Sequence, residues 1–382
     1  MISVLTILLL LIIYICFALY VGFHKLTDYN QSPLMIRTFD GSDSPYHPSV
    51  LYKKGYFSGY NYIMSETPFY ISLPNSGKRY RDQFECPSIH FSFDGIHWEE
   101  KILNPISDLT EKQKANKDYF SDPDLVITPD GIECWYRINR RYGSIHGHDK
   151  ISLLRKKSTD GILWSQEEEI INLETNGEAS VLGKIIVSPA VIFEQDKYKL
   201  WYVDNVHKGK GHIRYAYCEP SLSEWKDGNT INMEGPSISP WHIHILKDEN
   251  TYWLTVYDRN NITLWRGDSE KTFSYVKTLI TPSKIIGSFY SHGVYRACMI
   301  KTPESNYRLY FSGNDLFKTY IGIMEGETPE DMTIMNNDKP FRAYYSFSYI
   351  WTKTKLGEIH KRINYLIKRI WNIFAHHCKK RI

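Results

Sequence analysis

One strand pattern recurs five times along the middle of this chain. Each copy opens with a small or polar residue, often before a proline, and continues as a short apolar strand, a turn and a strand rich in Tyr and Trp. Successive copies start 75, 66, 52 and 53 residues apart, at His47, Asp122, Ser188, Pro240 and Gly293. A third strand-like stretch follows each copy. Two of these stretches end in the same Ser-x-Asp-Gly-x-x-Trp turn, at residues 92–98 and 158–164.

This repeat predicts an all-β, five-bladed β-propeller over residues 40–335. Units of this size suit propeller blades of about four strands each, and no convincing helix separates them. A β-sandwich is the alternative, but it would not readily give five copies of one strand order. Aromatic residues make up 15% of the chain, which favours strands and also a surface on which sugar rings could stack.

The N-terminus differs from the repeats. Residues 2–23 contain no charged residue and are long enough to cross a bilayer. We therefore expect a transmembrane anchor over residues 1–25. A cleaved signal peptide is the alternative, but no Lys or Arg precedes the apolar run and no small-x-small cleavage site follows it. Lys25 lies after the span and favours a cytoplasmic body, although the side of the membrane stays open.

The C-terminus, residues 345–382, is predicted to be a basic amphipathic helix. Residues 353–382 contain nine Lys or Arg and a single Glu. Apolar residues recur there every three or four positions, at Leu356, Ile359, Ile363, Ile367, Ile370 and Phe374. This pattern predicts docking to a membrane surface or to a partner. Packing of the helix against the protein's own body is the alternative.

Several classes of function find no support in the sequence. The six Cys occur singly without a CxxC pair, so we expect no zinc site and no other metal, and disulfides stay open. No GxGxxG, P-loop or HExxH motif is present, and we expect no cofactor. The net charge is only +3, and the basic run of residues 137–141 is short, so nucleic acid is not an expected partner.

The strand openings are the candidate site. The first strand of each propeller blade lies beside the central axis, so residues at the five openings converge on one funnel. Polar groups from separate strands can build a pocket in this way. The residues concerned are His47, Asp122, Ser188, Trp241 with His242, and Tyr295 with Arg296.

With these residues the chain resembles the five-bladed β-propeller glycosidases, the superfamily of glycoside hydrolase families 43, 32, 62, 68 and 117. The resemblance spans about residues 40–330. It rests on blade number, on the Asp-Pro and Ser-Pro-Ala openings and on the Ser-x-Asp-Gly-x-x-Trp turns. These families place an Asp in blade 1, an Asp in blade 2 and a Glu in blade 3. Asp122 matches the second position, whereas His47 and Ser188 depart from the first and third.

The resemblance implies three catalytic candidates. Asp122 would be the carboxylate that stays ionised and faces the anomeric carbon. Glu85 would be the acid or base, and His242 is an alternative acid, since members of family 117 are thought to use a His. The alternatives are a turn cap for Asp122, a surface salt bridge for Glu85 and a satisfied polar group for His242. Asp124 is expected to point away from the funnel.

A second group is assigned to substrate binding: His47, Arg137, Trp241, Tyr295 and Arg296. Trp241 could stack on a sugar ring. Arg137 and Arg296 could bind a carboxylate or sulfate on the sugar, or could instead form internal salt bridges.

These observations predict a membrane-anchored, glycoside hydrolase-like protein that acts on a cell-surface or capsular polysaccharide. If the protein is an enzyme, replacing Asp122 by Asn is expected to lower the rate by orders of magnitude while leaving folding nearly unchanged. A non-catalytic carbohydrate-binding propeller is an alternative, because two family carboxylates are missing. An accessory or transferase module in glycan or glycolipid assembly is another.

Overall fold

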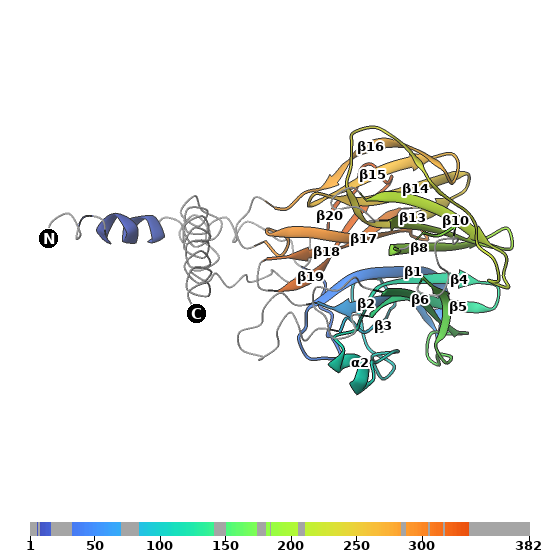
Figure 1. The fold of residues 1–382 in the computed structure, drawn as a ribbon. Coiled ribbons are helices and arrows are strands. Elements are labelled where there is room, and N and C mark those ends of the chain that lie inside the picture. Colours follow the sequence, from blue (N-terminus) through green and yellow to red (C-terminus); the bar gives the residue numbers. More distant parts are fainter. Residues whose placement is uncertain are drawn as a thin grey trace, which may run out of the picture.

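The computed structural model describes residues 6, 8–16, 33–69, 84–140, 150–173, 181–183, 185–204, 211–283, 288–304, 306–315 and 318–335. In this part of the chain the strands form five separate sheets, labelled by strand in Figure 1. Contacts between β1 (Pro45–Phe57) and β4 (Tyr119–Thr128), β4 and β8 (Val187–Glu194), β8 and β13 (Pro240–Asp248), β13 and β17 (Gly293–Lys301), and β17 and β1 close the five sheets into a ring around a common axis. Each sheet is built from consecutive strands, and these belong to one sequence repeat except in the fourth sheet, which also contains the short strand that precedes Pro240. The five-bladed β-propeller predicted from the sequence is therefore confirmed.

The strands are assigned to the blades as follows. Blade 1 contains β1 (Pro45–Phe57), β2 (Tyr60–Pro68) and β3 (Ser88–Ser92). Blade 2 contains β4 (Tyr119–Thr128), β5 (Gly131–Arg140), β6 (Lys150–Ser158) and β7 (Glu168–Asn172). Blade 3 contains β8 (Val187–Glu194), β9 (Lys197–Asp204), β10 (His212–Cys218) and β11 (Lys226–Thr230). Blade 4 contains β12 (Asn232–Glu234), β13 (Pro240–Asp248), β14 (Thr251–Asp258), β15 (Asn261–Gly267) and β16 (Thr272–Ile280). Blade 5 contains β17 (Gly293–Lys301), β18 (Tyr307–Asn314), β19 (Thr319–Gly326) and β20 (Thr333–Ile334), and a short helix, α2 (Glu111–Ala115), precedes blade 2.

The hydrophobic core consists of five layers, each between two neighbouring blades. Trp135 of β5 packs between blades 2 and 3, and Trp201 of β9 packs between blades 3 and 4. Similar layers separate blades 1 and 2, blades 4 and 5, and blades 5 and 1. Because every sheet is covered on both faces, its strands carry aromatic and β-branched residues on both sides.

The repeated Ser-x-Asp-Gly-x-x-Trp turn has the same structure in blades 1 and 2. In blade 1 the Ser92 hydroxyl accepts a hydrogen bond from Gly95 N–H at 2.8 Å, and Trp98 Nε1 donates to Gly95 O at 3.1 Å. Blade 2 repeats both bonds between Ser158, Gly161 and Trp164. Gly95 and Gly161 have φ of +77° and +87°, a conformation that glycine adopts without strain. These local requirements explain why the motif recurs.

The five innermost strands, β1, β4, β8, β13 and β17, share a bulge at the same level. In each of them one extra residue interrupts the pairing with the second strand of the blade, as between Ser121 and Asp124 in β4. In blades 1 to 3 the bulged residue precedes a proline and has a left-handed φ of 49–52°, at His47, Asp122 and Ser188. Such φ values are strained for residues other than glycine and are concentrated at functional sites.

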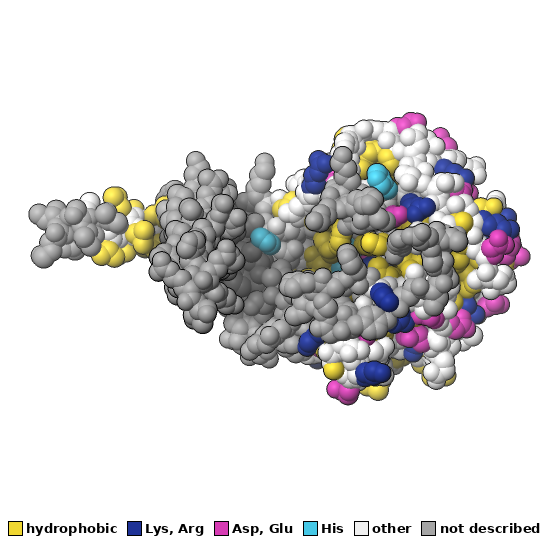
Figure 2. All heavy atoms as spheres, in the orientation of Figure 1, with side chains coloured by type: hydrophobic (Ala, Val, Ile, Leu, Met, Phe, Trp, Pro, Cys, Tyr) yellow, Lys and Arg dark blue, Asp and Glu magenta, His cyan; other side chains and the backbone are white. Residues whose placement is uncertain are grey.

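The two ends of the chain test the remaining predictions only in part. Residues 8–16 are helical, and their apolar side chains are exposed, with Leu8 at 52% and Leu10 at 61% (Figure 2). None of the helices in the described ranges is long and apolar enough to cross a membrane. The anchor predicted for residues 1–25 thus has no support from the described residues, and it extends beyond them. The C-terminal helix predicted for residues 345–382 lies outside the described residues.

Candidate active site at the propeller axis

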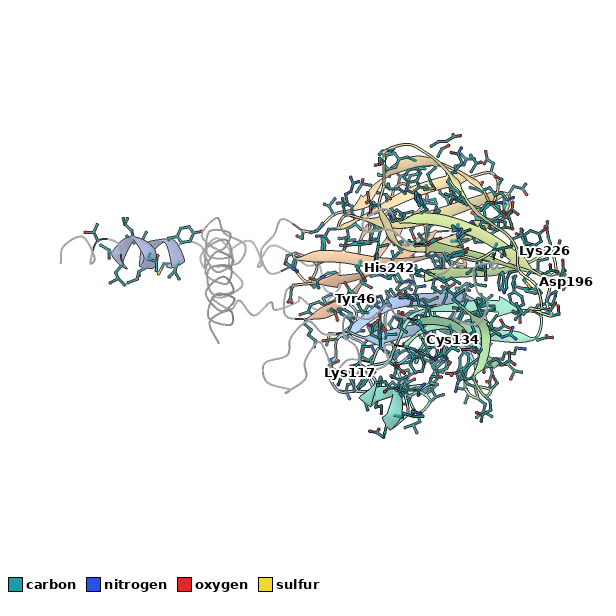
Figure 3. All side chains as sticks on the ribbon, in the orientation of Figure 1. Tyr46, Lys117, Cys134, Asp196, Lys226 and His242 are labelled. Carbon is teal, nitrogen blue, oxygen red and sulfur yellow. The ribbon has the colours of Figure 1, made fainter. Side chains whose placement is uncertain are left out.

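Three polar side chains from separate blades meet at the axis. His47 of β1, Asp122 of β4 and His242 of β13 have possible metal-binding atoms that all lie within 4.8 Å of one another. We call these three residues the axial cluster. All are buried, with exposures of 2%, 1% and 3%, respectively. His242 is labelled in Figure 3, near the end of the inner strands where Tyr46 of β1 is also labelled.

Asp122 is fixed through one of its two oxygens. Oδ2 lies 2.7 Å from Arg137 Nη2 and accepts a hydrogen bond from Ser188 N–H at 3.0 Å. Oδ1 has no hydrogen-bond partner and lies 3.4 Å from His242 Nδ1. Burial opposes ionisation, but the positive charge of Arg137 and the neighbouring His and Arg side chains outweigh it and hold the pKa of Asp122 far below its usual value. Asp122 therefore stays ionised, with one oxygen free.

His47 is oriented by residues of its own blade. Its Nδ1 lies 2.9 Å from Thr67 Oγ1 and 3.4 Å from Glu85 Oε2, whereas Nε2 has no hydrogen-bond partner. Burial lowers the pKa of His47 to about 3, so the ring is neutral at physiological pH. Donation from Nδ1 to Thr67 or Glu85 would leave the lone pair on Nε2.

His242 has the least satisfied side chain of the three. Neither of its ring nitrogens has a hydrogen-bond partner. Burial is the main cause that lowers the pKa of His242 well below its usual value, so this ring is also neutral. Its ring centroid lies 5.3 Å from that of His47. Unpaired polar atoms in so buried a place require an explanation, because burying a polar group without a partner costs free energy.

A divalent metal ion would satisfy these atoms. Two neutral imidazoles and one carboxylate form a ligand set that suits Zn²⁺ and other first-row divalent ions, and three protein ligands leave a position open for water or substrate. Glu85 beside His47 Nδ1, and Arg137 with Ser188 beside Asp122 Oδ2, are the outer contacts that such ligands require. The expectation of no metal rested on the absence of a CxxC pair, which has no bearing on ligands that come from three blades.

The two arginines predicted to bind substrate are internally paired. Arg137 bonds Asp122, and its Nη1 donates to Ile186 O at 3.1 Å. Arg296 is 0% exposed and donates from Nη2 to Asp124 Oδ1 at 3.2 Å. Both arginines therefore form internal salt bridges, which was the alternative to substrate binding.

Asp124 does not point away from the funnel, and that expectation was wrong. The bulge between Ser121 and Asp124 interrupts the alternation of side chains on which that expectation was based. Asp124 is buried at the axis, where Ser49 Oγ and Arg296 contact its Oδ1 and Val191 N–H donates to Oδ2 at 2.7 Å. Burial raises the pKa of Asp124 to about 6 despite Arg296. The contacts of Asp124 form a second polar layer, next to the axial cluster, that links blades 1, 2, 3 and 5.

Aromatic rings surround the axial cluster. The Tyr295 ring lies 4.2 Å from the His242 ring and stacks on Tyr46 at 5.2 Å. Trp241 is 38% exposed and meets His242 edge to face at 6.3 Å, so it is open to a bound ring, as a stacking role requires. Sequence reasoning missed Tyr46 and Thr67 as neighbours of the cluster. Thr67 has no signal in the sequence, because it lies on the second strand of its blade.

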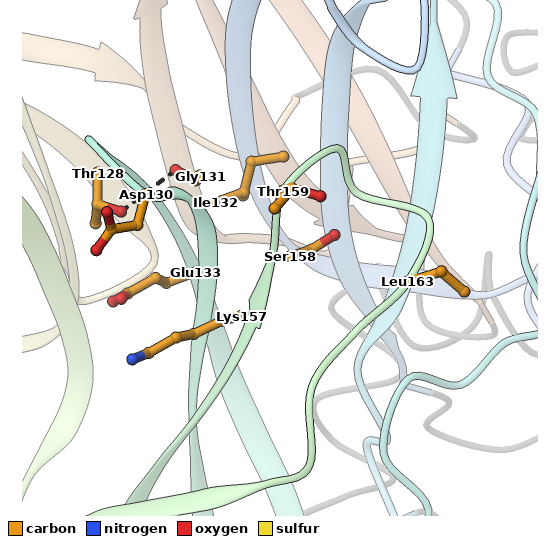
Figure 4. A pocket seen from close by; sticks show the side chains of 9 residues that line it. All are labelled: Thr128, Asp130, Gly131, Ile132, Glu133, Lys157, Ser158, Thr159 and Leu163. Carbon is orange, nitrogen blue, oxygen red and sulfur yellow. Dashed lines mark hydrogen bonds between the residues drawn. The ribbon is translucent and has the colours of Figure 1, made fainter.

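Two cavities elsewhere lack such a cluster. One of about 200 Å³ lies at the other end of β4, where Glu133 and Lys157 line it (Figure 4). Glu133 is already bound by Arg155 and the Trp135 indole N–H. The other, of about 450 Å³, lies between blades 1 and 5, beside Tyr52 and Arg308. Within the described ranges, the axial cluster alone unites three or more possible metal ligands.

Comparison with known proteins identifies relatives in structure only. No family model and no curated protein matches the chain. An N-acetylgalactosamine deacetylase from F. plautii, solved with blood group B trisaccharide, is 17% identical, with a TM-score of 0.63 and 78% of this chain and 95% of that chain covered. A β-xylosidase/α-arabinofuranosidase from a compost microbial metagenome is 12% identical, with a TM-score of 0.53 and coverage of 81% and 97%. A glycoside hydrolase family 43 enzyme from Xanthomonas citri is 12% identical, with a TM-score of 0.52 and coverage of 82% and 96%. The chain thus shares its five-bladed β-propeller fold with carbohydrate-active enzymes, and at the level of fold the resemblance seen in the sequence is confirmed.

Proposed function

We propose that this protein is a carbohydrate-active hydrolase whose reaction takes place at the axial cluster with the help of a bound divalent metal ion. The observation that carries the proposal is the set of unpaired, buried atoms on His47, Asp122 and His242. The shared fold supports a sugar substrate, since enzymes with this fold include a deacetylase of N-acetylgalactosamine and a β-xylosidase/α-arabinofuranosidase. We expect the substrate to be a cell-surface or capsular polysaccharide.

The bond that this site suits best is an acyl bond, an amide or ester on a sugar. A metal ion bound there would activate water and polarise the acyl oxygen. The chain's own residues hold the ligands in place, since Arg137 and Ser188 occupy one oxygen of Asp122 and Glu85 and Thr67 hold His47. Trp241 would position the sugar ring beside the cluster.

Hydrolysis of a glycosidic bond is the second candidate. Glu85 favours it, because this carboxylate is 7% exposed and lies next to His47 in the same funnel as Asp122. A glycosidase needs one carboxyl group to protonate the leaving oxygen and another to act as base or nucleophile. Asp122 is already engaged by Arg137, and Glu85 by His47, so we rank this candidate below the first.

The test is metal content together with product analysis. The purified full chain should carry about one divalent ion per protein, and His47→Ala and His242→Ala should lose it. His97→Ala is the matched control, because the His97 side chain is 79% exposed and does not belong to the axial cluster. Acetylated polysaccharides should release acetate only when the metal is present. A wild-type protein that takes up no metal would refute the metal-dependent proposal. Release of reducing sugar after chelation would establish the glycosidase instead.

We also propose that the N-terminal segment holds the protein at a membrane. The support is the charge-free sequence of residues 2–23 and the exposed apolar side chains of residues 8–14. The full chain should remain in the membrane fraction after alkaline extraction, and a chain starting at residue 33 should not. Full release of the intact chain from the membrane fraction by alkaline extraction would contradict this proposal.

Binding of residues 345–382 to anionic membranes stays a prediction, which a synthetic peptide and vesicles can test.

A further inference from the structure

Tyr295 differs from the other tyrosines around the axial cluster. Its ring centroid lies 4.2 Å from that of His242 and 5.6 Å from that of His47, so it contacts both histidines. The residue lies within the bulge in β17, which is bracketed by Val294 and Ala297. This bulge lets blade 5 present Tyr295 at the level of the cluster, while Arg296 reaches Asp124 in the layer below.

The hydroxyl groups of the neighbouring tyrosines interact with other polar groups of the protein. Burial raises the pKa of both Tyr46 and Tyr257, while the Asn314 side chain acts on the Tyr46 hydroxyl and the Asn260 backbone on the Tyr257 hydroxyl to lower it. In contrast, no residue of the described ranges is hydrogen-bonded to the Tyr295 hydroxyl, and the residue is half-buried rather than fully enclosed. Because the Tyr295 ring contacts both histidines, its unbonded hydroxyl is a hydrogen-bond donor available to a molecule bound at the axial cluster.

We propose that Tyr295 donates a hydrogen bond to the substrate oxygen that gains negative charge, which is the carbonyl oxygen of the acyl group. This inference rests on the proposed function and adds a residue to it. When water attacks the acyl carbon, the carbonyl π electrons move to that oxygen, and they return when the bond to the sugar oxygen or nitrogen breaks. The leaving atom takes up a proton that the attacking water has released, and the Tyr295 proton is shared but not transferred. A fixed donor at this oxygen lowers the barrier, because it stabilises charge that is present only in the transition state.

The rest of the aromatic wall supports the placement. Tyr295 stacks on Tyr46, at 5.2 Å and 14° between planes, and meets Tyr257 edge to face at 4.8 Å. A ring held on two sides cannot easily turn away, so its hydroxyl is fixed before substrate arrives. Such preorganisation is what makes a donor effective.

The experiment uses acetohydroxamate, a small acyl analogue that binds metal ions through its oxygens, on the Zn²⁺-loaded full chain. Tyr295→Phe removes only the hydroxyl and should weaken acetohydroxamate binding about tenfold, as expected for loss of one hydrogen bond to a charged oxygen. Its affinity for Zn²⁺ should stay within about twofold of wild type. Tyr257→Phe is the matched control, because that hydroxyl interacts with the Asn260 backbone and its loss should leave acetohydroxamate binding unchanged. Calorimetry measures both affinities.

Each other outcome overturns the inference in a recognisable way. Unchanged acetohydroxamate binding by Tyr295→Phe would refute the donor role while leaving the metal site intact. A parallel loss of Zn²⁺ affinity would show that Tyr295 acts by packing against His242. Equal weakening by Tyr257→Phe would assign the effect to the aromatic wall as a whole. A wild-type chain that binds no Zn²⁺ would refute the proposed function, and this inference with it.

Discussion

Replacing Asp122 by Asn should destabilise the protein even when no metal ion is bound. The sequence predicted that this change would leave folding nearly unaffected, but the structure places Asp122 in a buried ion pair. Asp122 is 1% exposed, the Arg137 side chain is 8% exposed, and their atoms lie 2.7 Å apart. The substitution keeps the size of the side chain and removes the charge that compensates Arg137.

The size of the loss in the free energy of unfolding depends on the hydrogen bonds that remain in the variant. Breaking a buried ion pair by changing one partner costs about 3–5 kcal/mol, because the other charge is left uncompensated. Nη1 of Arg137 retains the bond to Ile186 O at 3.1 Å, and an Asn oxygen could still accept from Ser188 N–H. We therefore expect the lower end, a loss of about 3 kcal/mol in the free energy of unfolding.

Denaturant unfolding in the presence of a chelator measures this loss without any contribution from metal. Asp122→Asn, Arg137→Gln and the double variant form a cycle, and the double variant should cost about 2 kcal/mol less than the two single losses combined. Asp268→Asn is a control, because the side chain of Asp268 is 88% exposed. The pKa of Asp122 is far lower in the folded than in the unfolded protein. Its contribution is therefore complete above about pH 4 and declines as the pH falls, so wild type and Asp122→Asn should converge in acid.

Three results would refute this reasoning. A loss below about 1 kcal/mol would mean that the pair contributes no more than an exposed one. Strictly additive losses would mean that Asp122 and Arg137 do not interact. A difference that widens as the pH falls would contradict the lowered pKa of Asp122.

Three further predictions concern the surroundings of the cluster. Glu85→Gln and Thr67→Val should each reduce metal affinity about tenfold by releasing His47 Nδ1, and unchanged affinity in both would show that His47 is held by packing alone. Burial, followed by Arg296, lowers the pKa of His244 to about 3, so this His stabilises the folded state above about pH 6.5 and its contribution declines as the pH falls toward 3. His244→Gln should reduce the slope of stability against pH between pH 6 and 4 by about 1.4 kcal/mol per pH unit, and an unaltered slope would mean that His244 is protonated in the fold. Trp241→Ala should weaken binding of the polysaccharide substrate by about tenfold with metal content unaltered, since its ring is 38% exposed to a bound sugar and meets His242 only edge to face, at 6.3 Å.

The sequence by itself determined the architecture and the set of residues at the axis. Five copies of one strand order were enough to predict five blades, because each copy must bury its aromatic strands against a neighbour. The openings at His47, Asp122 and Ser188 could be found because a residue before proline marks the same bulge in three blades. Trp241 and His242 followed from the same position in the fourth copy.

Only the tertiary structure decided what those side chains do. Whether Arg137 binds a substrate or Asp122, and whether Glu85 is free or holds His47, depends on contacts between strands that the sequence does not align. The pairing of Arg296 with Asp124 joins residues that are 172 positions apart. The bulge and the left-handed φ at residues 47, 122 and 188 also turn side chains in ways that simple strand alternation does not give. For this reason the unpaired nitrogens of His47 and His242, which point to a metal ion, emerge only when the five blades close around the axis.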